Sequence, residues 1–102
     1  MKDLITEAKN VIQKLKDAET LLSSPEVLGD QAKMKKASKD FAVAKQKAEL
    51  AETFLKTNQA LKDAKEAAES GEEELAEMAK EELPELEEKF EEIQEAFYDS
   101  LL

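Results

Sequence analysis

The stretch LLSSPEVLGDQ, residues 21–31, interrupts a chain that is otherwise built almost entirely of residues that favour helix. It holds Pro25 and Gly29, which are one of the two prolines and one of the two glycines in the sequence. Proline cannot donate the backbone hydrogen bond of a helix interior, and it disfavours helical geometry in the residue before it. The stretch therefore predicts that one helix ends here. Ser24 is a suitable amino-terminal cap for a short turn opening at the proline, and Asp30 is a suitable cap for the helix that follows.

Apolar residues recur at helical spacing on both sides of this break. Residues 3–22 carry one apolar face, formed by Leu4, Ile5, Ala8, Val11, Ile12, Leu15, Ala18 and Leu22. Residues 31–69 carry a coiled-coil seam, formed by Met34, Ala37, Phe41, Ala44, Ala48, Ala51 and Leu55. The stripe then moves back by one residue, to Phe54, Leu61, Ala64 and Ala68, because a straight helix drifts against a seven-residue repeat. Both segments are predicted to be helices, with Asn58 at a seam position that sets the register.

A second break at Ser70-Gly71 precedes a third helix, predicted over residues 72–100. We expect Gly71 to adopt the left-handed conformation that follows many helices, and Ser70 with Glu73 to form a capping box. The inward-facing residues of this helix are Leu75, Met78, Ala79, Leu83, Leu86, Phe90, Ile93, Phe97 and Leu101. Pro84 lies inside the segment and removes a backbone donor, so we expect a kink or a restart there.

The helix lengths predict an all-α fold with three antiparallel helices, because short connections favour antiparallel neighbours. The second and third helices would form a long two-helix coiled-coil hairpin. The shorter first helix would pack at one end of this hairpin, around Phe41 and Phe97. We expect a single helical domain over residues 1–102 and an elongated monomer.

Charge is distributed unevenly along the chain, which has a net charge of −10. Residues 28–69 contain nine lysines and seven acids, whereas residues 70–102 contain two lysines and thirteen acids. An acidic segment of this kind repels nucleic acid and anionic membrane. In an antiparallel hairpin the lysines of the second helix would face these acids, with Lys56 near Glu85 and Lys65 near Glu74 or Glu77.

The composition argues against catalysis and metal binding. The sequence has no histidine and no cysteine, so the commonest general base, the commonest metal ligand and the thiol nucleophile are missing. We expect no catalytic, cofactor-binding or metal-binding residues, no cofactor and no small-molecule substrate. No apolar run is long enough for a membrane span, and we expect a cytoplasmic protein with no membrane partner.

One cluster of lysines is the candidate binding surface. Lys33, Lys35, Lys36 and Lys39 lie together at the start of the second helix. Cations at a helix amino terminus oppose the helix dipole, at a cost of about 0.3–1 kcal/mol each at low ionic strength. Two interpretations stay open. The cluster is either a solubilising face with some pairing to acids of the first helix, or a contact for an anionic surface such as RNA.

Three stretches resemble a known family. LLSSPEVLGDQ at 21–31, KMKKASKDFA at 33–42 and EMAKEEL at 77–83 look like the amino-terminal helical domain of bacterial class I peptide chain release factors, closer to the type that recognises UAA and UAG. The resemblance covers most of the chain in the same order and spacing. In that family a leucine pair similar to Leu101-Leu102 leads into a linker, so the chain resembles a domain from a longer protein.

The resemblance implies a part in translation termination. It implies a helical arm near the GTPase-associated region of the large ribosomal subunit, in functional relation with the release factor GTPase and with the rest of its own chain. The family hydrolyses peptidyl-tRNA through a Gly-Gly-Gln loop and recognises stop codons through a Pro-x-Thr-type motif, and neither string occurs here. We therefore expect a non-catalytic domain, with the four lysines as its candidate ribosome or RNA contact. The alternative is a free-standing coiled-coil adaptor or chaperone-like interaction module.

Overall fold

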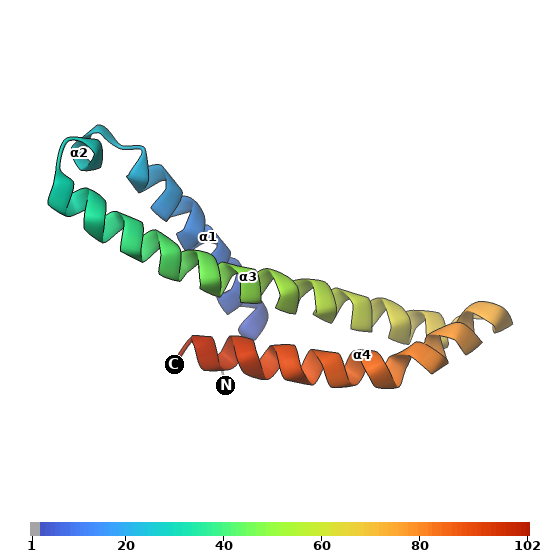
Figure 1. The fold of residues 1–102 in the computed structure, drawn as a ribbon. Helices are drawn as coiled ribbons and strands as arrows, with labels where there is room; N and C mark the ends of the chain where they lie inside the picture. Colours follow the sequence, from blue (N-terminus) through green and yellow to red (C-terminus); the bar gives the residue numbers. More distant parts are fainter. Residues whose placement is uncertain (1–2) are drawn as a thin grey trace. The chain divides into compact units, whose positions relative to one another are not determined.

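The computed structural model describes residues 3–102, and this part of the chain contains helices and no strands (Figure 1). Helix α1 spans Leu4–Leu22, α2 spans Pro25–Leu28, α3 spans Gln31–Ala68 and α4 spans Glu73–Ser100. The predicted all-α fold class is confirmed, and the helices expected over 3–22, 31–69 and 72–100 correspond to α1, α3 and α4. Contacts divide the chain into two compact units, one up to Glu52 and one from Thr53, and α3 contributes to both. The single-domain organisation stays a prediction.

In the first unit, α1 runs antiparallel to the first part of α3 (Figure 1). Small residues are buried on both helices: Ala8 is 0% exposed on α1, and Ala48 is 1% exposed on α3. Val11 and Ala37 are buried as well. Short side chains at these positions let two helix backbones approach closely, and all four belong to the apolar faces that the sequence spacing predicts. Ile5, which was expected on the same face of α1, is 38% exposed.

Hydrogen bonds between neighbouring residues form the corner that joins α1 to α3. The Ser24 hydroxyl accepts a bond from the backbone amide of Val27 at 3.4 Å, with the proline in the first turn of α2. The Asp30 carboxylate accepts bonds from the amides of Ala32 and Lys33 at 3.0 and 3.2 Å. Both predicted caps are thus confirmed. Val27 is 4% exposed, so the single turn of α2 is anchored by one buried side chain.

In the second unit, α4 runs antiparallel to the last turns of α3 (Figure 1). Three aromatic rings pack against one another between these helices. The ring of Phe54 lies 5.4 Å from that of Phe97 and 5.7 Å from that of Phe90, measured between ring centres. Phe97 is 0% exposed and Phe54 is 2% exposed. Rings at these separations attract each other beyond the effect of burial alone, so this cluster stabilises the packing of α4 on α3.

The apolar stripe of α3 shifts by one residue, as predicted, but its polar member differs from the prediction. Phe54, Leu61 and Ala64 are buried in the shifted stripe. Between them lies Thr57, which is 5% exposed, whereas Asn58 is only half-buried. The shifted spacing continues through position 57, so the buried polar residue of the stripe is Thr57 rather than Asn58.

The corner between α3 and α4 has neither the left-handed Gly71 nor the capping box of Ser70 and Glu73 that the sequence predicts. No glycine among residues 3–102 has a positive φ angle, so Gly71 is not left-handed. The amino-terminal cap of α4 is Glu72 and no side chain caps the helix, while the Ser70 hydroxyl donates to the carbonyl of Glu72 at 3.4 Å. The end of α3 closes instead through bonds between residues three apart, from Glu69 to Glu66 and from Ser70 to Ala67, at 3.2 and 3.1 Å. Such bonds satisfy the last carbonyls without a left-handed residue.

Pro84 does not interrupt α4, which is helical without a break from Glu73 to Ser100. The restart considered for this position is therefore absent. Figure 1 shows the axis of α4 changing direction in its orange, amino-terminal part. The side chain of Pro84 is exposed, so the ring occupies solvent rather than the helix interface.

Candidate functional site

The four lysines of the predicted binding surface are all exposed on the first turns of α3. Two of them are paired with acids. Lys33 Nζ lies 2.9 Å from the carboxylate of Glu26 on α2, and Lys36 Nζ lies 3.1 Å from that of Asp40, one turn further along α3. Both pairs are solvent-exposed and each contributes at most about 1 kcal/mol. The acids that pair with these lysines therefore lie on α2 and α3, and not on the first helix.

The other two lysines of the cluster have no ion-pair partner in the part of the chain that the structure describes. Lys35 and Lys39 are four residues apart on α3, so their side chains project from the same side of the helix one turn apart. This arrangement leaves two free ammonium groups close together on an exposed helical face. Chemically, such a pair can contact phosphate groups as point charges, without the bidentate geometry that arginine provides.

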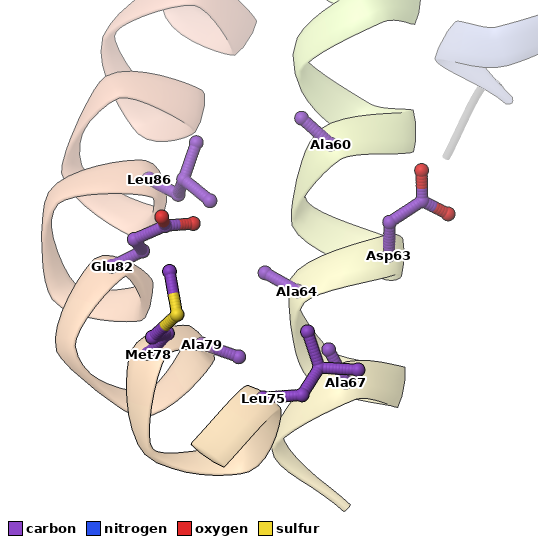
Figure 2. A pocket seen from close by; sticks show the side chains of 9 residues that line it. All are labelled: Ala60, Asp63, Ala64, Ala67, Leu75, Met78, Ala79, Glu82 and Leu86. Carbon is purple, nitrogen blue, oxygen red and sulfur yellow. The ribbon is translucent and has the colours of Figure 1, made fainter. Parts of the chain in front are cut away.

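A second feature, not predicted from the sequence, is an apolar groove between α3 and α4 near the corner that joins them (Figure 2). Its volume is about 430 Å³. It is lined by Ala60, Asp63, Ala64 and Ala67 of α3 and by Leu75, Met78, Ala79, Glu82 and Leu86 of α4. We call this feature the α3–α4 groove.

The groove exists because short side chains on α3 face longer ones on α4. Figure 2 shows Ala60 and Ala64 pointing toward α4, with Met78 and Ala79 on the facing helix. The methyl groups of the alanines do not fill the space, so Leu75 and Met78 stay 45% and 60% exposed. The prediction that these two residues face a closed interior was wrong.

Acidic side chains around the groove are not neutralised by lysines. The ion pairs of Lys33 with Glu26 and of Lys36 with Asp40 involve no residue that lines the groove. Lys56 and Lys65, which were expected to lie near Glu85 and near Glu74 or Glu77, form no ion pair with these acids. On the groove itself, Asp63 accepts a hydrogen bond from the Gln59 side chain at 2.9 Å, which leaves its negative charge uncompensated.

The described residues contain no group of three or more side chains suited to hold a metal ion. No helix in the described range is long and apolar enough to cross a membrane. The carboxylate of Asp3 caps the start of α1. Its pKa is lowered by the hydrogen bond from the Thr6 hydroxyl and, to a smaller extent, by that from the Ile5 amide. It acts as a helix cap, so this pKa shift belongs to the fold.

A family model described as the PCRF domain matches residues 11–102. The chain belongs to this family. The match supports a peptide chain release factor domain, which confirms the resemblance at the level of the family and links the chain to translation termination and, in general terms, to the ribosome. The matched part of this PCRF domain contains the corner, both long helices, the lysine cluster and the α3–α4 groove. No curated protein and no solved structure matches the chain.

Proposed function

We propose that this PCRF domain is the amino-terminal helical domain of a class I release factor of the type that recognises UAA and UAG. The observation that carries the proposal is the family match over residues 11–102, which includes every helix from the middle of α1 onward. The corner at 21–31, where the resemblance to that domain is most distinctive, supports it further. The Gly-Gly-Gln string of peptidyl-tRNA hydrolysis does not occur in these residues. In this proposal the domain helps to position the release factor on the ribosome and does not hydrolyse peptidyl-tRNA.

The domain acts as an arm near the GTPase-associated region of the large ribosomal subunit. It works in relation to the release factor GTPase and to the remainder of its own chain, as a cytoplasmic monomer. Helical hairpins suit such a role because their length spans distance with few residues and their faces can be rigid contact surfaces.

The ribosome contact of the arm is the exposed lysine pair, Lys35 and Lys39, on the first turns of α3. Their ammonium groups are free in the described structure, so they can approach phosphate groups without first breaking an ion pair. Lys33 and Lys36 add to this surface by exchanging their exposed carboxylate partners for phosphate. Each lysine–phosphate contact releases condensed counterions, which makes the binding dependent on salt.

A competition experiment in reconstituted termination tests the proposal. The chain is added in excess to ribosomes carrying peptidyl-tRNA at a UAA codon together with an intact class I factor, and peptide release is timed. We expect slower release, because the arm occupies the same site as the arm of the intact factor. The double variant Lys35→Glu/Lys39→Glu should compete more weakly than the matched double variant Lys14→Glu/Lys16→Glu on α1, which makes the same change in net charge at exposed positions.

Two results would contradict the proposal in different ways. Unchanged release at a large excess of the chain would exclude binding of the arm at this site. Equal competition by the two double variants would leave the arm in place but remove the lysine pair from its contact surface.

A further inference from the structure

We propose that the α3–α4 groove binds one amphipathic helix, with cationic flanks, from a partner protein. The inference rests on the apolar lining of the groove and on the charge around it. It is independent of the proposed function, because it concerns a different part of the molecule from the lysine pair.

The groove offers apolar surface that the fold itself does not cover. Leu75 and Met78 are three residues apart on α4, so they lie on one face of the helix and leave 45% and 60% of their surfaces exposed. The alanines of α3 form the opposite wall at Ala60, Ala64 and Ala67. Covering these side chains with apolar groups of a partner removes their exposed surface from water, which favours association. The unbranched thioether side chain of Met78 adapts its shape to what covers it.

The charge around the groove selects a cationic partner. Residues 60–86 contain ten acids and three lysines, a net charge of −7, and the two charged residues that line the groove, Asp63 and Glu82, are both acidic. This field repels nucleic acid. It also repels a second copy of the chain, because that copy has a net charge of −10 as well. A partner with lysine or arginine beside its apolar residues is attracted and correctly oriented.

The geometry favours a helix over an extended segment. Both walls of the groove are helices, whose backbone donors and acceptors are used within the helices, so no free edge is available to pair with a strand. A partner helix satisfies its own backbone hydrogen bonds and inserts side chains at spacings of three and four, as in other complexes of a helix in an apolar groove. The occupant is therefore one amphipathic helix with apolar side chains of leucine size and with basic residues flanking them.

A binding titration with designed peptides tests the proposal. The probe is a fluorescently labelled peptide of about 18 residues with leucines on one helical face and lysines at the flanks of that face. One control peptide has the same composition in scrambled order, without an apolar face. A second control keeps the leucines and replaces the lysines with glutamates. We expect the chain to bind the probe, and to bind both control peptides at least about tenfold more weakly.

Variants of the chain localise the binding. Met78→Ser removes an exposed apolar contact and should weaken binding of the probe about fivefold to twentyfold. Ala60→Leu fills the groove from its exposed α3 wall and should weaken binding as well. The matched control is Val43→Ser, which removes an exposed apolar residue of α3 outside the groove and should leave binding unchanged. Circular dichroism of each variant verifies that the helices are intact.

Three outcomes would overturn the proposal. Equal binding of the probe and the scrambled peptide would mean that charge alone is recognised. Equal affinities of the Met78→Ser and Val43→Ser variants would place the binding elsewhere. Self-association of the chain that Met78→Ser abolishes would show that a second copy, rather than a cationic helix, covers the groove. None of these results depends on whether the chain competes in termination.

Discussion

At the scale of single residues, side-chain oxygens cap the start of three of the four helices in residues 3–102. Asp3, Ser24 and Asp30 accept hydrogen bonds from the first free amides of α1, α2 and α3. Helix α4 has no such cap, but Glu73 and Glu74 lie in its first turn, where the positive end of the helix dipole favours acids. Hydrogen bonding thus starts the helices of the amino-terminal half, and dipole electrostatics favours the start of the last one.

The Asp3 cap makes α1 sensitive to acid. The hydrogen bond from the Thr6 hydroxyl, at 2.8 Å, is the main cause of the lowered pKa of Asp3. Because the folded-state pKa is lowered, the contribution of the cap is fully present above the unfolded-state pKa, about 3.9. It is lost as pH falls through the folded-state pKa. Titration of the Asp3 carboxyl by NMR should give a pKa below the ordinary value, and Thr6→Val should raise it. An unchanged pKa in Thr6→Val would contradict this account.

Gly71 is a position where glycine is not required. Its φ angle is not positive, and a Cβ atom built there meets no atom within 4 Å. Alanine restricts the unfolded chain more than glycine does, so Gly71→Ala should raise the free energy of unfolding by about 0.4–1 kcal/mol. Chemical denaturation measures this change, with Gly29→Ala as the comparison. A Cβ atom at position 29 would lie 3.4 Å from the Pro25 carbonyl oxygen, so Gly29→Ala should raise the free energy of unfolding less. A loss of stability in Gly71→Ala would indicate a left-handed corner after all.

At the scale of elements, local sequence predicted the helices well because their determinants are local. Apolar spacing and the capping residues Ser24 and Asp30 act within one or two turns, and both can be recognised without knowing the fold. The conformation of Gly71 could not be predicted from the sequence. A helix can end either with a left-handed residue or with a tightened last turn, such as the one at Ser70. The sequence is compatible with both.

The α3–α4 groove was missed because it depends on two helices together. Leu75 and Met78 have the spacing of core residues, and only their partners decide whether they are covered. A signal was present: in an antiparallel hairpin turning at residue 71, Ala67 and Ala64 are as far from the turn as Leu75 and Met78. Alanine opposite a large side chain leaves space. The lysine cluster, in contrast, was evident from the sequence, whereas its ion pairs were not, because exposed pairs are weakly determined.

Pro84 should destabilise α4, although the helix continues through it. Proline in a helix interior removes one backbone hydrogen bond and clashes with the preceding turn. Since Pro84 is exposed, its ring buries little surface to offset this cost, and Pro84→Ala should stabilise the protein by about 1–3 kcal/mol. Denaturant unfolding measures the gain, with Glu85→Ala as the neighbouring exposed control. Equal midpoints for Pro84→Ala and the unsubstituted chain would mean that α4 is adapted to the proline.

The aromatic cluster should carry much of the stability of the second unit. Phe97→Ala removes a fully buried ring that contacts Phe54, and should cost about 3–5 kcal/mol. Phe41→Ala should cost less, because Phe41 is only half-buried. Lys35→Ala, at an exposed position, should change stability by no more than about 0.5 kcal/mol. A thermal midpoint for Phe97→Ala within the range of Lys35→Ala would show that the ring is not a core residue.

At the scale of the whole molecule, the net charge of −10 dominates the electrostatics. Lys33 with Glu26 and Lys36 with Asp40 form attractive ion pairs, and both pairs are exposed to solvent. The thirteen acids of residues 70–102 repel one another with two lysines among them. Repulsion between exposed charges should therefore outweigh attraction, and the folded state should be under electrostatic stress at low ionic strength.

Added salt should stabilise this protein rather than weaken it. Sodium chloride screens exposed charges over a Debye length of about 10 Å at 0.1 M. We expect the thermal midpoint to rise when salt is raised from a few millimolar to about 0.15 M, because repulsion along α4 is screened. Replacing Glu88, Glu91 and Glu92 with glutamine should reduce this dependence on salt. A midpoint that falls with salt would mean that the two ion pairs matter more than the acidic helix.

The corner at 21–31 has a consequence for the order of assembly. Its caps join residues two or three apart, Val27 is buried at its centre, and the Lys33–Glu26 pair spans only seven positions. Closing such short loops takes well under a microsecond in an unfolded chain, far less than docking two long helices. The corner can therefore form first and hold the ends of α1 and α3 together, which lowers the entropic barrier to their encounter. The stretch that interrupts the helices in the sequence is thus the segment from which we expect folding of the first unit to start.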